Sequence, residues 1–436
     1  MARAHRRTFF SVAAIVAVIG PATCRVGSDP QALAQQTVSA STRERATDAV
    51  ARIRRADYEG NREALRSLVE GLTPDPADAV FASRVHYWRG FGLWRRAING
   101  FNQNAEAKDL TADFERAVTD FERAATLDPT FADAKLAIVS CFQGLAFVRR
   151  NDTTLSNGGI DLAAYSRLFK ELTTSASDNP RFLWVQGASL WYALPGLSDA
   201  EIATRRKRAF DTYQRGLQLA RTVTAPKNAM EPSWGEPELL MNLAWSHLNA
   251  NPPDLAAAEF YANQALALVP YWQYVRDILL PQIRQTGSQR RLDVFVGRWT
   301  AKGRTHAVAN GGSASDTTGV VINRRTARDN WLLSEVTLDG VPPYAVTVVM
   351  APTPDASYVA IVVNNLVPMP LQYAGRWLDD RVLELEMSAS AGGRRQRVRY
   401  TVLSDTQMEF LVTESRDEGR TYVPHSSLTL TKEADR

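Results

Sequence analysis

Residues 383–387 read Leu-Glu-Leu-Glu-Met, and residues 397–402 read Arg-Val-Arg-Tyr-Thr-Val. Apolar and polar side chains alternate in both runs, which is the period of a β-strand with one buried face. The intervening residues 391–393, Ala-Gly-Gly, are typical of a tight hairpin turn. The hairpin predicted from this stretch places two opposite-charge pairs on its outer surface, namely Glu384 with Arg399 and Glu386 with Arg397.

The same alternation recurs through the rest of the C-terminal part. About ten strand-like runs lie between Val294 and Lys432, with turn residues at fairly regular intervals. Such a series indicates an antiparallel sandwich or an up-and-down barrel. We therefore expect an all-β domain over residues 291–433.

Upstream of this region the hydrophobic residues follow a helical spacing. From Thr42 to about Thr286 they recur at intervals of three and four residues, as one face of an α-helix requires. Glycine and proline fall mostly between these stretches. The polar residues from Gln282 to Arg291 then predict a short linker. The chain should fold as an all-α domain over residues 42–286, followed by the all-β domain.

A short pattern returns within the helical stretches, over roughly residues 78–280. Ala117, Phe121, Ala124 and Pro129 have a small-aromatic-small-proline spacing that resembles the second helix of a tetratricopeptide repeat. Small residues at a helix crossing let two helices nest, and large residues fill the space between pairs. Looser versions of this spacing occur at Trp88-x2-Phe91-Gly92, Trp184-x2-Gly187-Ala188, Ala209-x3-Tyr213-x2-Gly216, Leu240-x2-Leu243-Ala244 and Ala258-x3-Ala262-x2-Ala265-x4-Pro270.

The resemblance to tetratricopeptide repeats implies a stack of helix pairs with a concave face that binds a peptide or protein segment. Three arginines, Arg89, Arg95 and Arg96, are candidates to line that face, and a solvated helix surface is their alternative position. The spacing is irregular, because about a dozen extra residues separate Trp88 from Ala117. A non-repeating helical bundle is therefore the alternative fold.

The first strand of the β region carries a second resemblance. Gly297-x-Trp299 at its start is similar to the signature of lipocalin-like (calycin) barrels. In that family the tryptophan plugs the closed end of the barrel, and a basic residue of the last strand covers it. Lys432 matches that basic residue by position. The resemblance implies a lipocalin-like antiparallel barrel that is either structural or holds a small apolar ligand.

One histidine suggests a cofactor. Pro424-His425 precedes the expected final strand, Leu428 to Lys432, and this placement resembles the nitrobindin type of haem-binding calycin barrel. The resemblance implies that His425 ligates haem iron, as a neutral imidazole can. The family's glycines after the tryptophan are only partly present, because Ala301 replaces the first of them. The alternative is that His425 is an ordinary loop residue and that the barrel holds no cofactor.

Residues 1–34 have the features of an export signal. Arginines precede the apolar run Phe9–Ile19, which is too short to span a bilayer, and small residues precede a cut after Ala34. The pair Arg6-Arg7 resembles a twin-arginine signal, with the general secretory route as the alternative. A lipoprotein signal ending at Cys24 fits its flanking residues less well. We expect a periplasmic or secreted protein.

Composition disfavours two classes of partner. Loss of residues 1–34 removes four arginines and one aspartate, which lowers the formal net charge from +4 to +1. Nucleic-acid binding depends on clustered positive charge, so a nucleic-acid partner is not expected. No second apolar segment is long enough to span a bilayer. Only Cys141 remains after processing, so no intramolecular disulfide is expected.

The sequence contains no motif that assigns catalysis. It lacks paired-cysteine metal sites, a His-Glu-x-x-His helix, a phosphate-binding glycine loop and a Gly-x-Ser-x-Gly turn. We therefore predict no catalytic residues and no metal site. The leading interpretation is an exported, non-catalytic interaction scaffold whose helical stack docks a protein or peptide and whose barrel is accessory. The alternative is a carrier of a small apolar ligand or haem in the barrel, and an enzyme is the third hypothesis.

Overall fold

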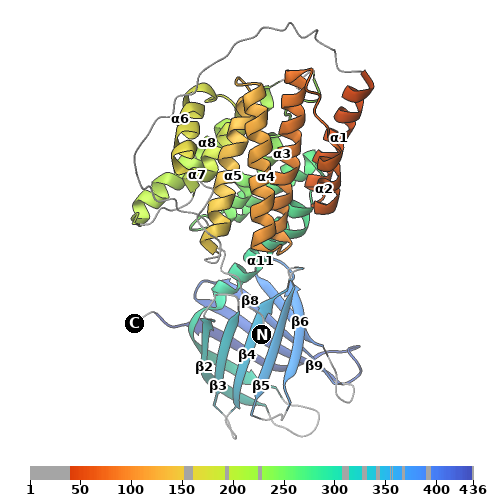
Figure 1. Ribbon diagram of the computed structural model, residues 1–436. Helices are drawn as coiled ribbons and strands as arrows, with labels where there is room; N and C mark the ends of the chain where they lie inside the picture. Colours follow the sequence, from red (N-terminus) through yellow and green to blue (C-terminus); the bar gives the residue numbers. More distant parts are fainter. Residues whose placement is uncertain are drawn as a thin grey trace, which may run out of the picture. The chain divides into compact units, whose positions relative to one another are not determined.

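The chain divides into two compact units, Met1–Leu279 and Leu280–Arg436, which we call the helical unit and the barrel unit. Their fold classes are those expected from the sequence, all-α followed by a closed antiparallel barrel (Figure 1). The export signal at residues 1–34 and the turn at residues 391–393 lie outside the described residues. The computed structural model describes residues 40–151, 161–191, 196–223, 228–306, 314–326, 331–339, 344–353, 355, 357–365, 369–388 and 394–434.

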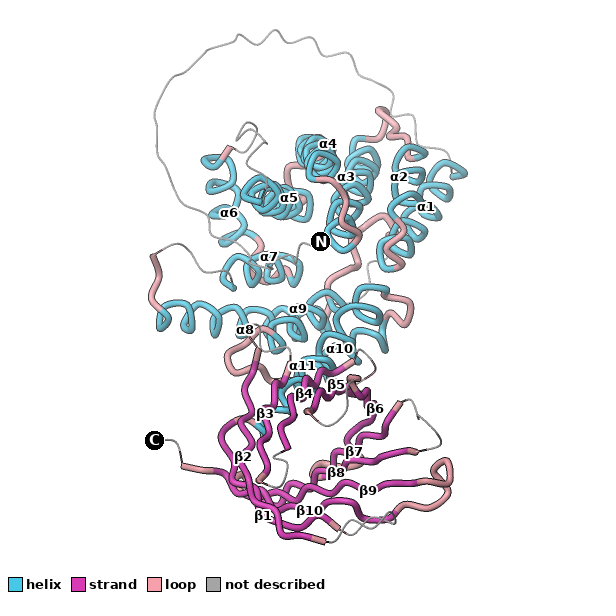
Figure 2. The backbone as a smooth tube through the Cα atoms, turned by 90° about the horizontal axis from the view of Figure 1, so that it is seen from below, coloured by secondary structure: helices cyan, strands magenta, loops and turns pink. Residues whose placement is uncertain are grey.

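The helices of the helical unit follow one another around its interior (Figure 2). Asn61, Asp78, Asp161, Ser198 and Asp254 cap helix N-termini by accepting backbone N–H groups, as such side chains favour. The described elements are α1 (Ala40–Tyr58), α2 (Arg62–Gly71), α3 (Ala79–Asn102), α4 (Ala107–Leu127), α5 (Ala132–Asn151), α6 (Leu162–Ser175), α7 (Pro180–Trp191), α8 (Asp199–Thr222), α9 (Glu236–Leu248), α10 (Leu255–Leu268) and the π-helical turn η1 (Tyr274–Leu279).

Consecutive helices pack closely where glycines face aromatic rings. A Cβ atom at Gly187 of α7 would lie 2.3 Å from Cε1 of Tyr213 on α8. A Cβ atom at Gly90 of α3 would lie 3.0 Å from the ring of Phe121 on α4. This is the nesting of small and aromatic residues that the spacing pattern predicts. Gly92 of α3 likewise allows a close approach, here of the preceding helix α2, because a Cβ atom would lie 2.4 Å from Cγ2 of Val69.

The helical unit departs from an open repeat stack. Tyr58 of α1 donates its hydroxyl hydrogen to Oε1 of Glu238 on α9 at 2.7 Å, although 180 residues separate the two. The Tyr58 ring also meets Trp272 edge-on, with ring centroids 5.0 Å apart. In a solenoid each repeat contacts only its neighbours. The contacts of Tyr58 thus join the first helix to the last part of the unit. The helices nest as expected, but the assignment to tetratricopeptide repeats stays a prediction.

The barrel unit is a closed ten-stranded antiparallel barrel in the order β1-β10-β9-β8-β7-β6-β5-β4-β3-β2. Every strand pairs with its sequence neighbours, and β1 pairs with β10 to complete the circle. The strands are β1 (Gly297–Thr305), β2 (Ser315–Arg325), β3 (Leu332–Leu338), β4 (Tyr344–Pro352), β5 (Tyr358–Asn364), β6 (Leu371–Trp377), β7 (Val382–Met387), β8 (Arg395–Ser404), β9 (Gln407–Ser415) and β10 (Val423–Lys432).

The hairpin predicted from residues 383–402 is confirmed, as β7 and β8. Glu384 lies opposite Arg399 and Glu386 opposite Arg397, in the register expected from the alternation. An Arg399 guanidinium nitrogen is 2.6 Å from a Glu384 carboxylate oxygen, and the Arg397 to Glu386 distance is 3.4 Å. Between them Leu385 faces the core, paired with Val398.

The linker predicted from Gln282 to Arg291 is wrong. Residues Leu280–Arg291 form helix α11, which belongs to the barrel unit and continues into a short 3-10 turn, η2 (Leu292–Phe295). Ile283 and Ser288 are buried on one side, while polar residues cover the rest. The polar composition therefore marks the solvated faces of a helix, and Gly287 does not break it.

No helix in the described part of the chain combines the length and the hydropathy that crossing a membrane requires.

We expect Gly187→Ala to destabilise the helical unit by about 1–3 kcal/mol, because the added methyl group overlaps the Tyr213 ring. Gly71→Ala is the matched control, since nothing lies within 4 Å of a Cβ atom there. This control should leave stability unchanged or raise it by up to about 1 kcal/mol. Chemical denaturation followed by circular dichroism measures both, and equal effects would contradict the packing described.

Candidate functional site

At one end of the barrel lie the three residues singled out in the first and last strands, Gly297, Trp299 and Lys432. The Trp299 side chain is fully buried, and its Nε1 donates to the Phe295 carbonyl oxygen at 2.7 Å. The Lys432 ammonium nitrogen lies 5.5 Å from the centroid of the Trp299 ring. Gly297 has φ +126°, and a Cβ atom there would lie 2.6 Å from Cε of Lys432. The structure thus brings Gly297, Trp299 and Lys432 together.

This end, which we call the closed end, is also tied to η2 and α11. Asn323 donates its amide to the Phe295 carbonyl oxygen at 2.8 Å, and the Tyr358 hydroxyl donates to the Ser288 carbonyl oxygen at 2.8 Å. Inward-facing side chains from the strand termini at this end are buried, among them Leu332, Tyr358, Leu383 and Met408.

The opposite end, which we call the open end, has a different interior. Inward-facing apolar side chains there are only partly buried, among them Leu338, Val362, Leu371, Met387 and Val398. Since these side chains face inward, their exposed parts lie inside the barrel or at its mouth. The interior therefore changes from a packed core at the closed end to an accessible apolar wall towards the open end.

Polar groups gather on the inner wall near the open end. Glu414 shares a face of β9 with the core residue Met408, and its side chain is almost fully buried. Arg394 donates to Oε2 of Glu414 at 2.6 Å, and Arg416 donates to Oε1 at 3.0 Å. Burial would raise the pKa of Glu414, but hydrogen bonds from Arg416 and Arg394 outweigh it and hold that pKa below its ordinary value.

A second polar pair lies beside this carboxylate. The Tyr373 hydroxyl donates to Oε1 of Gln396 at 2.7 Å, and Gln396 lies directly opposite Glu414 on the neighbouring strand. Burial raises the pKa of Tyr373 to about 12, so its hydroxyl stays protonated at neutral pH. The wall here offers hydroxyl, amide and guanidinium groups next to apolar side chains.

His425 is not the loop residue that the sequence allowed as its alternative. It stands within β10, at a bulge between Pro424 and Ser426, and its carbonyl oxygen accepts from the backbone N–H of His306 at 2.9 Å. Burial lowers the pKa of His425, and the Glu414 carboxylate opposes this shift only in part. The imidazole is therefore neutral at pH 7, the form that can ligate iron. Among the described residues no group of three or more His, Cys, Asp and Glu side chains could hold a metal ion.

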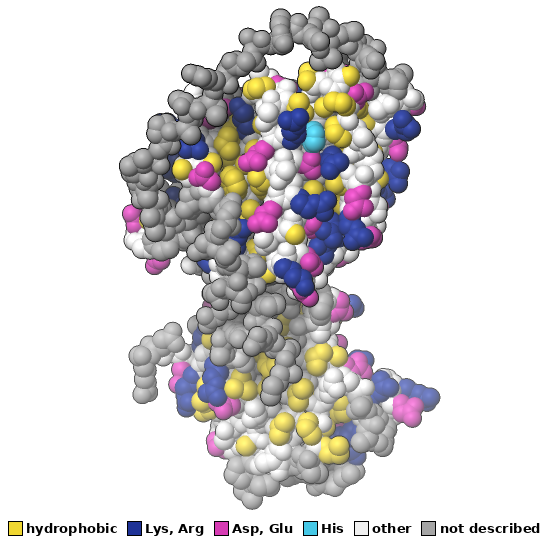
Figure 3. All heavy atoms as spheres, in the orientation of Figure 1, with side chains coloured by type: hydrophobic (Ala, Val, Ile, Leu, Met, Phe, Trp, Pro, Cys, Tyr) yellow, Lys and Arg dark blue, Asp and Glu magenta, His cyan; other side chains and the backbone are white. Residues whose placement is uncertain are grey.

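In the helical unit the candidate arginines are engaged by carboxylates. Arg95 Nε donates to Asp57 at 2.8 Å in a buried pair, and Arg89 Nε donates to Asp120 at 3.3 Å. Arg96 is bonded to the buried Asp113. On the face seen in Figure 3, basic and acidic side chains lie next to one another. The three arginines thus pair with carboxylates of their own unit, and these contacts do not indicate a surface that binds a partner.

The interior of the helical unit is filled by a segment of its own chain, residues 228–235. Trp88 Nε1 donates to the Met230 carbonyl oxygen at 2.7 Å, and Trp234 Nε1 donates to the Tyr87 hydroxyl at 2.8 Å. The Trp234 ring centroid lies 5.7 Å from those of both Trp94 and Trp184.

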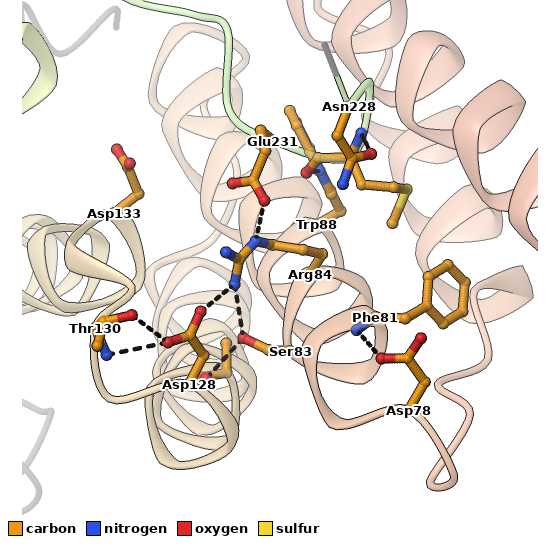
Figure 4. A network of polar contacts seen from close by, with 12 residues as sticks. Asp78, Phe81, Ser83, Arg84, Trp88, Asp128, Thr130, Asp133, Asn228 and Glu231 are labelled. Atoms are coloured by element: carbon orange, nitrogen blue, oxygen red, sulfur yellow. Dashed lines mark hydrogen bonds and ion pairs between the residues drawn. The ribbon is translucent and has the colours of Figure 1, made fainter. Parts of the chain in front are cut away.

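A polar network holds the same segment. Arg84 of α3 lies between two carboxylates, donating to Glu231 of the segment and to Asp128 after α4, each at 2.8 Å (Figure 4). Each of these three charged groups thus has a partner of opposite sign. The segment and α3 are joined by both apolar and ionic contacts, so the segment is part of the core.

The sequence analysis missed the polar wall around Glu414. Its signal was present, because Met408, Phe410, Val412 and Glu414 stand at alternate positions and so share one face of a strand. A charge in phase with three apolar residues points into the barrel. Arg394 could not be assigned in the same way, because it lies before the start of β8. Its contact with Glu414 can be known only from the pairing of the strands.

No family model and no curated protein matches the chain. Among solved structures, the S-type phycobiliprotein lyase CPES from Guillardia theta is 10% identical, covers 35% of this chain and 98% of its own, and has a TM-score of 0.26. The structure of EF1p2_mFAP2b bound to DFHBI is 13% identical, covers 34% and 99%, and has a TM-score of 0.18. At these scores neither likeness carries an argument about this chain.

We expect Glu414→Gln to lower the free energy of unfolding by about 1–3 kcal/mol at neutral pH, because Arg394 and Arg416 lose their carboxylate. Since the folded-state pKa is lowered, ionised Glu414 stabilises the fold above its ordinary value of 4.5, and this contribution is lost as the pH falls through the folded-state pKa. The difference between variant and wild type should therefore shrink in acid.

Glu409→Gln is the control for that measurement, because Glu409 is exposed on the outer face of the same strand. Urea denaturation at several pH values gives both curves. A Glu414→Gln effect that is constant down to strongly acidic pH would contradict the ionised cluster.

Proposed function

We propose that the barrel binds a small apolar molecule in its interior, which enters from the open end. The supporting observation is the set of inward-facing apolar side chains that remain partly exposed inside a closed barrel, such as Val362 and Val398. A site of this kind gains affinity by removing apolar surface of both ligand and wall from water.

The polar wall at the open end adds a preference for an amphiphile. Arg394 and Arg416 both bind the Glu414 carboxylate, so charged, hydrogen-bonding groups lie next to the apolar part of the wall. The Tyr373–Gln396 pair supplies neutral hydrogen-bonding groups beside it. A ligand with an apolar body and a polar end would therefore match both parts of the interior.

Haem is one candidate that the sequence resemblance implies for this interior. The neutral imidazole of His425 is suited to binding iron. A visible spectrum and native mass spectrometry of the purified protein test this candidate. A haem absorption band that disappears in His425→Ala would support it, whereas a protein without such a band would leave only the other apolar ligands.

Docking of a protein or peptide on the helical unit stays a second proposal. The engagement of Arg89, Arg95 and Arg96 with carboxylates gives it no specific support. An exported location likewise remains a proposal that rests on residues 1–34.

We expect Val362→Trp to weaken binding of the neutral fluorescent probe N-phenyl-1-naphthylamine about tenfold or more, because the indole fills the interior. Val363→Trp is the matched control, since Val363 faces outward from the same strand and is exposed. It should bind the probe as the wild type does. Absence of saturable binding to the wild type, or equal losses in both variants, would contradict the proposed function.

Expression of the full chain with a C-terminal tag in a bacterium tests the exported location. We expect a periplasmic or secreted product whose N-terminal residue is Gln35, as determined by intact mass. Ala34→Asp should prevent the cut at that position, because a signal peptidase requires a small residue there. An uncut chain confined to the cytoplasm would refute export.

A further inference from the structure

The outward face of strands β3, β4 and β5 is mostly apolar. Every second side chain of these strands points out of the barrel, and the strand registers place the outward residues next to one another. Among their described outward positions Glu335 is the single charged residue, and the others are aliphatic or threonine. We call this surface the apolar outer face. Its larger aliphatic side chains are Leu333, Val349, Val359, Ile361 and Val363.

This composition differs from that of the β7–β8 hairpin. On β7 and β8 the outward positions are charged, with Glu384 opposite Arg399 and Glu386 opposite Arg397. Strands β4 and β5 are instead hydrophobic on both of their faces, a pattern typical of strands that are covered on both sides. In Figure 3 hydrophobic side chains lie over the part of the barrel unit where Figure 1 draws β3 to β5. The outer side of these strands thus has the composition of an interface.

Large side chains on this face are accessible. Ile361 is 47% exposed and Val363 is 51% exposed, and both lie on β5. They belong to a continuous patch, because Val349 lies opposite Leu333 on one side and opposite Ile361 on the other. Single exposed aliphatic residues are common on protein surfaces, whereas contiguous patches mark sites of association.

The apolar outer face carries no net charge and therefore complements itself. Glu335 is paired, because a guanidinium nitrogen of Arg324 on the adjacent strand β2 lies 3.3 Å from its carboxylate. Two copies of the face would thus meet without the repulsion that opposes contact between like charges. A strongly charged partner would find no counter-charge here. The face fits an uncharged apolar surface, and a second copy of the chain supplies one of the same size.

The size of the face fits a weak association between copies. The apolar outward positions continue onto β2 with Val320 and Ile322, and onto β6 with Ala374. Five strands about 4.8 Å apart and about 20 Å long make a face of about 500 Å². Two copies would together bury about 1,000 Å², which is about the smallest area of a specific interface.

We propose that the apolar outer face binds the same face of a second copy of this chain, in a dimer with two-fold symmetry. Each copy contributes the same residues to such an interface, so Ile361 of one copy packs among the aliphatic side chains of the other. Apolar side chains of two sheets interdigitate in face-to-face packing, with the sheets about 10 Å apart. The inference is independent of the ligand proposed for the barrel interior, because these residues point away from it.

Sedimentation equilibrium of the purified protein at about 1–300 µM tests the proposal. We expect a monomer–dimer equilibrium with a Kd of about 1–100 µM, because the buried area is small. Ile361→Lys and Val363→Lys should each raise this Kd about tenfold or more, because both copies then bring a charge into the apolar contact. Both residues are exposed, so neither substitution should unfold the barrel, and circular dichroism verifies this.

Leu403→Lys is the matched control, since Leu403 is exposed to a similar extent and lies on β8, outside the apolar outer face. It adds the same charge and should dimerise as the wild type does. The proposal is overturned if the wild type stays monomeric over this range, or if Ile361→Lys and Val363→Lys associate as tightly as the wild type. A monomeric wild type that binds phosphatidylcholine vesicles, with binding lost in Ile361→Lys, would assign the face to a lipid surface and would also overturn the proposal.

Discussion

The pairing of β1 with β10 is the constraint on which the barrel unit depends. It joins the first strand to the last, with Trp299 opposite Lys432, and removes the two free edges that an open sheet would expose. In the closed barrel alternate side chains of each strand point into the interior, and the buried Trp299 lies at one end of it. The accessible wall, the polar cluster near Glu414 and the support for α11 all follow from this closure.

Among the described residues, the buried charged side chains discussed above each have a hydrogen-bonding partner. Asp57 and Arg95 are both buried in the helical unit and bonded to each other, and Glu414 in the barrel receives two guanidinium groups. Such pairs recover only part of the desolvation cost, so they add little net stability. A charged hydrogen bond requires a narrow range of distances and directions, whereas apolar contacts do not. These pairs therefore favour one arrangement of the surrounding helices and strands.

Periodicity was sufficient to predict both fold classes and the pairing of Glu384 with Arg399, because these depend on local alternation. It failed for α11, where a glycine and several polar residues suggested a linker. These residues form a helix, because one side of it is buried against the barrel. It also failed for the arginines of α3, whose carboxylate partners are distant in sequence. His425 lies inside a strand at a bulge, and the local sequence pattern does not predict a bulge there.

The segment that carries Trp234 affects the order in which the helical unit can form. During synthesis α1 to α7 emerge before residue 234, so the indole that fills their shared interior is still absent. The bond between Tyr58 and Glu238 likewise waits for 180 further residues. Until nearly the whole unit has been made, the early helices therefore lack the contacts that fill their shared interior. A truncation before residue 228 would therefore leave the helices without the segment that fills their centre.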